Sequence, residues 1–178
     1  MRLFIALLPD ADLVAYLGEQ VSLLKAAAKS GTFTHSANLH ITLAFLGEQK
    51  NAQAAEEALE ELRFAPFSFA LGAIGLFKQE KGDTIWMGVQ ASAQMTELHK
   101  QLARALMAHG LPVEKRRFHP HMTFGRQVVL GKPLEMIAFA QAPHDFSVDA
   151  VSLMRSDRYD GRLVYTEVSR VHAMTAED

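Results

Sequence analysis

A four-residue pattern of histidine, apolar residue, threonine and apolar residue occurs twice in this chain, as His40-Ile41-Thr42-Leu43 and as His121-Met122-Thr123-Phe124. Each copy lies in a stretch with the composition of a β-strand. Because successive side chains of a strand point to opposite faces, the histidine and threonine of each copy share one face. The repeat therefore predicts two similar strands that each present one histidine and one threonine opposite a buried apolar face.

Length and composition favour one compact unit. The chain has 178 residues, of which 49% are apolar, enough for a buried core. No linker rich in proline, serine or glycine divides it. The order of helix, motif strand, helix and paired strands recurs approximately in both halves, although no residue-level repeat extends beyond the tetrapeptides. We therefore expect residues 1–178 to form a single bilobed α/β (α+β) domain with a shared central cleft.

Charge and cysteine content exclude several classes of function. A net charge of -2 argues against an extended nucleic-acid surface, although a local basic patch remains compatible with it. The absence of cysteine excludes disulfides, thiolate metal sites and cysteine nucleophiles. A reducing cytoplasm fits this lack of cysteine, so we expect a cytoplasmic protein. We expect no signal peptide and no membrane span, since the first residues read as a buried strand and no apolar run is long enough to cross a bilayer.

Apolar periodicity and capping residues predict the other elements. A first helix is expected from a cap at Asp10 or Asp12 to Gly31, a second after Asn51, and a third between Ser92 and Gly110. A short helix should follow residue 133. The strands are expected near residues 39–46, 67–77, 84–90, 146–154 and 163–171, in addition to the N-terminal strand and the second motif strand.

These residues resemble the 2H phosphoesterase superfamily and, within it, the RNA 2',3'-cyclic phosphodiesterase (2'-5' RNA ligase-like) family. The resemblance covers nearly the whole chain. The segments that carry it are residues 2–7, Asn38 to Leu43 with Phe45-Leu46-Gly47, and the most specific run, His119 to Arg126. It implies two antiparallel sheets with flanking helices and pseudo-twofold symmetry around a catalytic groove. It also implies opening of RNA cyclic phosphate ends to 2'-phosphates, with joining or cleavage of 2'-5' linkages in some members.

The residue types suit this chemistry independently of the resemblance. Opening a cyclic phosphate needs a base that activates water and an acid that protonates the departing oxygen, and two histidines can divide these roles without a metal or other cofactor. The hydroxyls of Thr42 and Thr123 are candidates to stabilise the nonbridging oxygens. The resemblance assigns His121 as the base and His40 as the acid, an assignment that the residues alone leave reversible.

Three further features are candidates for substrate binding. Arg126 matches a ligand-binding arginine of the family, but strict alternation from His121 places it on the opposite face, so a bulge at Gly125 is required. Phe4 is a candidate stacking surface or a core aromatic of the first strand. The basic run of residues 115–117, just before the second motif, either guides an RNA backbone or is a solvated loop.

Other interpretations stay open. His119 shares strand parity with His121 and is assigned a supporting role. Residues 157–160 read as a turn, with a place at the rim of the cleft as the alternative. Five further histidines lack a comparable setting: His35, His99, His109, His144 and His172. The expected partners are RNA 3' ends or cyclic-phosphate nucleotides, with no membrane and no obligate protein partner. The alternatives are a metal hydrolase, for which no ligand spacing is recognisable, a noncatalytic RNA-end binding module, and an enzyme for small metabolites such as ADP-ribose 1'',2''-cyclic phosphate.

Overall fold

The computed structural model describes residues 1–90 and 92–174. Its helices are α1 (Ala11–Ala27), α2 (Gln53–Glu60) and α3 (Ala93–Ala108), with 3-10 turns η1 (Ser36–Asn38) and η2 (Leu134–Met136). Its strands are β1 (Arg2–Leu7), β2 (Ala28–Phe33), β3 (Ile41–Glu48), β4 (Phe67–Phe69), β5 (Leu71–Phe77), β6 (Asp83–Val89), β7 (His121–Leu130), β8 (Phe146–Val148), β9 (Ala150–Tyr159) and β10 (Arg162–His172).

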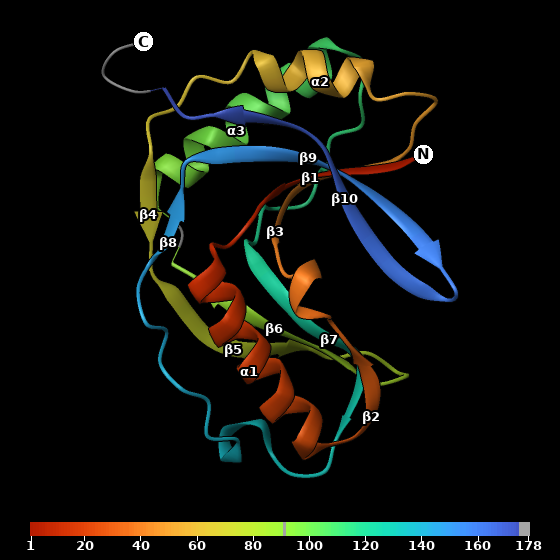
Figure 1. Ribbon diagram of the computed structural model, residues 1–178, viewed down its shortest axis with the longest axis vertical. Helices are drawn as coiled ribbons and strands as arrows, with labels where there is room; N and C mark the ends of the chain where they lie inside the picture. The colour runs from red at the N-terminus through yellow and green to blue at the C-terminus, as the bar shows by residue number, and fades with distance from the viewer. Residues whose placement is uncertain (91, 175–178) are drawn as a thin grey trace.

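Antiparallel pairing builds two half-sheets. The first has the order β10-β9-β1-β3, and the second contains β5, β6 and β7, with β2 on the far edge of β7 (Figure 1). One residue pair, Ile41 with Met122, joins β3 to β7 and makes the halves continuous. A separate two-stranded sheet pairs β4 with β8. The predicted mixed α/β class with two antiparallel sheets is confirmed, and the two predicted sheets are halves that meet at their motif strands.

Each half-sheet has its own helical cover. Helix α1 lies over the half that contains β7, whereas α2 and α3 pack together beside β9 and β10 (Figure 1). The side chain of Asp10 caps α1 by accepting a hydrogen bond from the Leu13 amide, as predicted. Leu13, Leu17 and Leu24 follow helical spacing and are fully buried. Each such leucine contributes about 1.5–3 kcal/mol of burial free energy, so one apolar face fixes the helix on the sheet.

The chain passes between the halves several times. Strand β1 lies in the first half-sheet, the following α1 and β2 belong to the second, and β3 returns to the first. The last two strands, β9 and β10, then complete the first half, where β9 pairs with β1. Because distant segments interleave in this way, neither half consists of one continuous stretch of sequence.

The first helix is shorter than predicted. It ends at Ala27, and residues up to Phe33 form β2 instead of continuing the helix to Gly31. Gly31 lies inside that strand at φ 151°, where a Cβ atom would approach Val128 Cγ2 to 3.0 Å. Local periodicity missed β2 because most of its residues are exposed and polar, so no alternation of apolar residues marks it.

Other boundaries also moved. Residues 67–77, predicted as one strand, divide into β4 and β5, which belong to different sheets. The N-cap of α2 is Ala52 instead of Asn51, although the Asn51 side chain still accepts a hydrogen bond from the Gln53 amide. The Ser92 cap of α3 and the short turn after residue 133 occur where predicted.

Candidate active site

One strand pairing brings the two sequence motifs together. Ile41 pairs with Met122 in antiparallel register, and each follows its motif histidine directly. That register places each histidine across from the other strand's threonine, with His40 and His121 on a diagonal. Diagonal neighbours on adjacent strands have Cα atoms roughly 7–8 Å apart, a span that aromatic side chains can cover. The structure therefore gathers both histidines and both threonines on one face, which we call the catalytic face.

The two imidazoles are anchored in the same way. His40 Nδ1 lies 2.7 Å from the carbonyl oxygen of Asn38, and His121 Nδ1 lies 2.7 Å from that of His119. A carbonyl can only accept a hydrogen bond, so Nδ1 carries the proton in both rings. In the neutral tautomer each Nε2 then offers a lone pair. This leaves the two Nε2 atoms as the groups available for proton transfer.

The Nε2 atoms differ in what they contact. The Thr42 hydroxyl lies 2.9 Å from His40 Nε2 and donates to it when the ring is neutral. His121 Nε2 makes no hydrogen bond within the described residues, although Thr123 is its counterpart of Thr42. Of the two histidines, His121 is thus the one whose Nε2 atom is available to a substrate or a water molecule.

Burial and neighbouring cations lower the pKa of both histidines. For His40 the main cause of the lowered pKa is burial, opposed by the bond to the Asn38 carbonyl, with smaller contributions from the charges of Arg126 and His121. For His121 burial again lowers the pKa most, opposed by the His119 carbonyl, and the charges of His119 and Arg126 lower it further. Both imidazoles therefore favour the neutral state until an anion arrives.

A β-bulge turns Arg126 toward the catalytic face. Trp86 of β6 pairs with Thr123, but its neighbour Ile85 pairs with Gly125, so β7 carries one extra residue between them. The alternation shifts by one position there, and Arg126 returns to the side of His121. The predicted bulge at Gly125 is confirmed. A Cβ at Gly125 would lie 2.8 Å from Val128 Cγ2, which explains the glycine.

A matching bulge occurs in β3 and exposes a residue that sequence reasoning missed. Ile5 pairs with Ala44 and Ala6 with Thr42, so β3 also carries one extra residue. The bulge turns Phe45, five positions after His40 as Arg126 is after His121, to the catalytic face. Phe45 is 54% exposed. The only local signal would have been this shared offset, because strict alternation places Phe45 on the opposite face.

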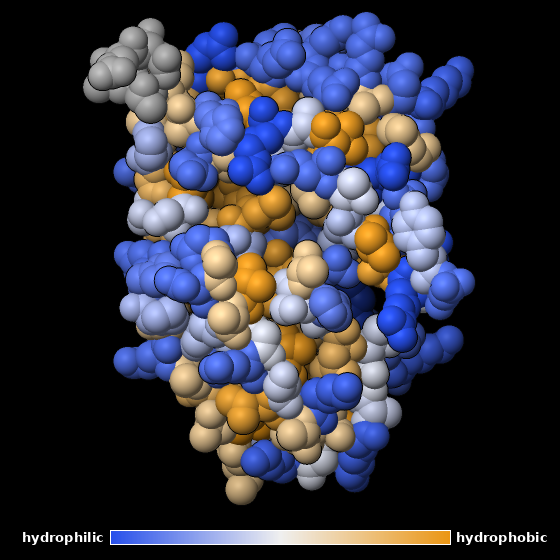
Figure 2. Space-filling model, viewed as in Figure 1, coloured by the Kyte–Doolittle hydropathy of each residue, from blue (hydrophilic) through white to orange (hydrophobic). Residues whose placement is uncertain are grey.

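Phe4 occupies a different position from the one expected of a stacking surface. It is only 3% exposed, because His40, Phe45 and Tyr165 pack around its ring with centroids 4.8–6.3 Å away. Phe4 therefore has little free surface for a base and instead supports His40. The ring of Tyr165, in β10, also contacts the His40 ring edge-on, with centroids 5.2 Å apart. No local sequence pattern predicted this contact, because the two residues are far apart in the chain. Beside this β9–β10 hairpin the molecular surface is hollowed (Figure 2).

A second aromatic group surrounds His121. The rings of Phe77 and Trp86 lie 5.5 and 6.0 Å from the His121 ring, and His119 lies 5.9 Å away. The indole Nε1 of Trp86 is buried without a hydrogen-bond partner in the described part of the chain. Leaving such a group unpaired costs about 1–3 kcal/mol. The position of this ring is thus maintained at a cost in stability.

Two of the other histidines, His99 and His109, take structural positions. His109 bonds Glu61 and approaches Glu57, which links α3 to α2. His99 stacks on Phe118 with centroids 4.0 Å apart.

No cluster of three or more potential metal ligands occurs within residues 1–90 and 92–174. None of the helices in these ranges combines the length and apolar character that a membrane crossing needs. The basic run at residues 115–117 is exposed and precedes His119 in the chain.

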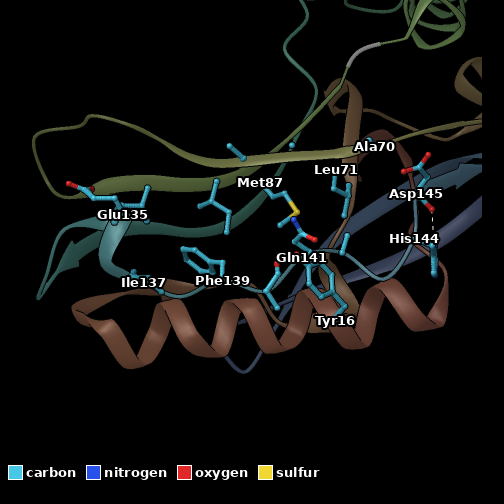
Figure 3. A pocket seen from close by; sticks show the side chains of 16 residues that line it. Tyr16, Ala70, Leu71, Met87, Glu135, Ile137, Phe139, Gln141, His144 and Asp145 are labelled. Atoms are coloured by element: carbon cyan, nitrogen blue, oxygen red, sulfur yellow. Dashed lines mark hydrogen bonds between the residues drawn. The ribbon is translucent and has the colours of Figure 1, made fainter.

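A cavity lies behind the second half-sheet. It measures about 690 Å³ and is enclosed by α1, β5 and the segment 134–145 (Figure 3). Met87 lines it, whereas its strand neighbour Trp86 faces the catalytic side. Tyr16 closes one wall by donating to the Ala140 carbonyl. The cavity is therefore separated from the two histidines by the sheet itself.

A bilobed antiparallel sheet that presents two histidine–threonine pairs across one strand pairing is the arrangement of the 2H phosphoesterase class. A family model described as the 2'-5' RNA ligase superfamily matches residues 14–160. The chain belongs to this superfamily. The resemblance inferred from the motifs is thereby confirmed.

Individual relatives agree with this membership. An RNA 2',3'-cyclic phosphodiesterase of Thermotoga maritima is 33% identical over 131 residues, which cover 71% of this chain and 70% of that protein. The crystal structure of E. coli LigT in apo form is 26% identical, covers 98% of both chains and has a TM-score of 0.77. LigT complexed with 3'-AMP is 25% identical over 98% of both chains, with a TM-score of 0.75. The expected enzyme class, a phosphodiesterase hydrolase, is confirmed by these relatives.

Proposed function

We propose that this protein hydrolyses RNA 2',3'-cyclic phosphate termini to 2'-phosphomonoesters without a metal. The observation that carries the proposal is the pair of identically anchored imidazoles, whose Nδ1 protons are bound to carbonyl groups so that each Nε2 is the atom that exchanges a proton with substrate. The name of the Thermotoga maritima relative supports the substrate class. We further propose that residues 1–178 act as one bilobed domain; a cytoplasmic location stays a prediction.

In the proposed reaction a water oxygen attacks phosphorus and the bond from phosphorus to the 3' oxygen breaks. His121 Nε2 takes the proton of the water, and His40 Nε2 donates a proton to the 3' oxygen. The phosphate stays on the 2' oxygen and a 3' hydroxyl is released. The unoccupied Nε2 of His121 supports its role as the base, because that atom is free to bind a water. In the free protein the lowered pKa of both rings favours their neutral forms. Binding of the negatively charged phosphate favours protonation of His40, the proposed acid.

The other polar groups of the catalytic face bind the phosphate in this proposal. Arg126 supplies the positive charge, and the Thr42 and Thr123 hydroxyls donate to the nonbridging oxygens as negative charge builds on phosphorus. Thr42 must turn its hydroxyl away from His40 Nε2 to do so, which frees that nitrogen at the moment it is needed. Phe4 acts indirectly by packing against the His40 ring.

The catalytic face also suits the same displacement at phosphorus by a nucleophile other than water. If the 5' hydroxyl of a second RNA replaces water, the product is a 2'-5' phosphodiester, and the reverse reaction cleaves it. We therefore include reversible 2'-5' RNA ligation in the proposal. A second candidate, hydrolysis of small cyclic nucleotides, is supported by the LigT complex with 3'-AMP, a mononucleotide.

The decisive experiment uses an oligonucleotide that ends in a 2',3'-cyclic phosphate, incubated with the protein in a metal chelator. The expected result is turnover to a product whose phosphate remains on the 2' hydroxyl. Phosphate on the 3' hydroxyl would contradict the assignment of the leaving oxygen. Loss of turnover in chelator that added metal restores would indicate a metal hydrolase, and binding without turnover would indicate an RNA-end binding module.

A further inference from the structure

Phe77 and Trp86 form an aromatic shelf on the second half-sheet. Their ring centroids lie 5.0 Å apart, and Phe77 is 39% exposed although it is a large apolar side chain. Trp86 lies over Gly75 of β5, where a Cβ atom would come within 2.6 Å of the indole ring. Because Gly75 has no side chain, the indole of Trp86 can lie against β5. In that position the indole packs against the ring of Phe77.

This shelf adjoins His121, the proposed general base of the reaction. The Phe77 ring meets the His121 ring edge-on at 5.5 Å and the exposed His119 ring at 5.9 Å. The other exposed ring of the catalytic face, Phe45, lies in the opposite half-sheet. A phosphate held between the two histidines thus has one exposed aromatic ring on each side.

Cationic side chains lie close in sequence to Phe77 and to His119, the two ends of this aromatic group, although the turn after Phe77 also carries Glu80 and Asp83. Lys78 and Lys81 lie in the turn after Phe77, and the exposed run at residues 115–117 leads into His119. Lys78 is near Asp83 at 3.9 Å and Arg116 is paired with Glu114 at 2.7 Å. No ion pair occurs at Lys81, Lys115 or Arg117 within the part of the chain that the structure describes.

We propose that the Phe77–Trp86 shelf stacks the base of the nucleotide that precedes the cyclic phosphate, so that the enzyme prefers RNA ends of two or more nucleotides over mononucleotides. This proposal rests on the proposed function. Single-stranded RNA bases stack on exposed aromatic rings, and phosphates are bound by lysine and arginine. The terminal nucleoside brings no phosphate besides the reacting one, whereas each preceding nucleotide adds another. The aromatic ring flanked by cations therefore fits the preceding part of the RNA.

The test measures kcat/KM for a cyclic-phosphate mononucleotide and a cyclic-phosphate dinucleotide, with wild type, Phe77→Leu and Phe77→Tyr. We expect wild type to favour the dinucleotide. Phe77→Leu removes the aromatic face and should lower the dinucleotide-to-mononucleotide ratio about tenfold, which corresponds to about 1.4 kcal/mol. Phe77→Tyr keeps the ring and should restore the ratio. The ratio isolates stacking from any change at His121, because such a change affects both substrates.

Phe45→Leu is the matched control, because it removes an exposed ring from the opposite half-sheet. We expect it to change both substrates in parallel and leave the ratio unaltered. The shelf proposal is overturned if Phe77→Leu leaves the ratio at its wild-type value, or if Phe45→Leu shifts it instead. It is also overturned if wild type shows no preference for the dinucleotide. Absence of turnover on both substrates would be a separate result, since it contradicts the proposed function itself.

Discussion

In the half-sheet of β3, His40 packs against the buried Phe4 and against Tyr165, and its Nε2 is hydrogen-bonded to Thr42. In the half-sheet of β7, the anchoring bond through Nδ1 is the same, but the His121 ring lies beside the exposed ring of Phe77, and its Nε2 makes no hydrogen bond within the described residues. The two halves thus share a way of holding an imidazole and differ in its surroundings. In the proposed reaction this difference is what lets two identical side chains take opposite roles in proton transfer.

The two halves also differ in the residue that lies five positions after each motif histidine, which is Phe45 in one half and Arg126 in the other. Matching bulges turn Phe45 and Arg126 to the same face, yet one is an uncharged ring and the other a cation. Arg126 lowers the pKa of both histidines, so one residue of the second half affects the protonation of both. The duplicated backbone therefore supplies the geometry, whereas unequal side chains supply the polarity of the site.

Removing either imidazole should have the largest effect. His40→Ala and His121→Ala should each lower kcat by roughly 100-fold or more, because each removes a proton-transfer group. Single-turnover assays on a cyclic-phosphate oligonucleotide would measure this, with His172→Ala on the outer strand β10 as the control. If the assignment is right, the residual rate of His121→Ala loses its fall at low pH and that of His40→Ala loses its fall at high pH. The opposite pattern would reverse the roles, and wild-type rates in both variants would refute the mechanism.

Arg126 should come next. Arg126→Gln removes the cation of the catalytic face and should lower kcat/KM by about 10- to 100-fold, whereas Arg126→Lys should retain more of the activity. A cation disfavours protonation of a neighbouring histidine, so its removal should raise the pKa of both His40 and His121.

The pH profile of kcat/KM tests that second effect. With both histidine pKa values below the ordinary 6.5, the wild-type optimum should lie on the acidic side of that value. Arg126→Gln should move the optimum to higher pH. An unchanged optimum in this variant would show that Arg126 is too far from the rings to influence them.

The threonines should have smaller, separable effects. Thr42→Val and Thr123→Val each remove one hydroxyl donor without changing the strand, and we expect kcat to fall about fivefold to tenfold for each. Comparing the two variants sharpens the contrast between the halves, since only the Thr42 hydroxyl contacts its histidine in the free protein. Thr34→Val, whose hydroxyl donates to the Thr123 carbonyl instead of facing the site, tests whether a strand contact alone explains the loss.

The two bulges should differ in their tolerance of a side chain. Gly125→Ala places a Cβ atom 2.8 Å from Val128 Cγ2 and should lower the free energy of unfolding by about 1–3 kcal/mol. The corresponding residue of β3 is an alanine, and Ala44→Gly should cost only about 0.5–1 kcal/mol. Thermal denaturation of both variants would measure this. Equal stability of Gly125→Ala and wild type would mean that the bulge can relax around the methyl group.

Much of the local structure followed from short patterns. The aspartate and serine caps of α1 and α3 and the apolar stripe of α1 are determined by neighbours within a few residues. The two motif strands are equally local, since alternation and β-branched or aromatic residues mark them. Strand β2 escaped prediction because its pairing with β7, not its own composition, makes it a strand.

By itself the sequence determined that two strands each present a histidine and a threonine, and it named Arg126 together with the bulge that the arginine requires. Only the tertiary structure decided that Ile41 pairs with Met122, that Phe45 matches Arg126 in position, and which aromatic rings surround each imidazole. The physical reason is range. Side-chain alternation and capping depend on adjacent residues, whereas strand register and the packing of rings from β5, β6 and β10 depend on contacts between segments far apart in the chain.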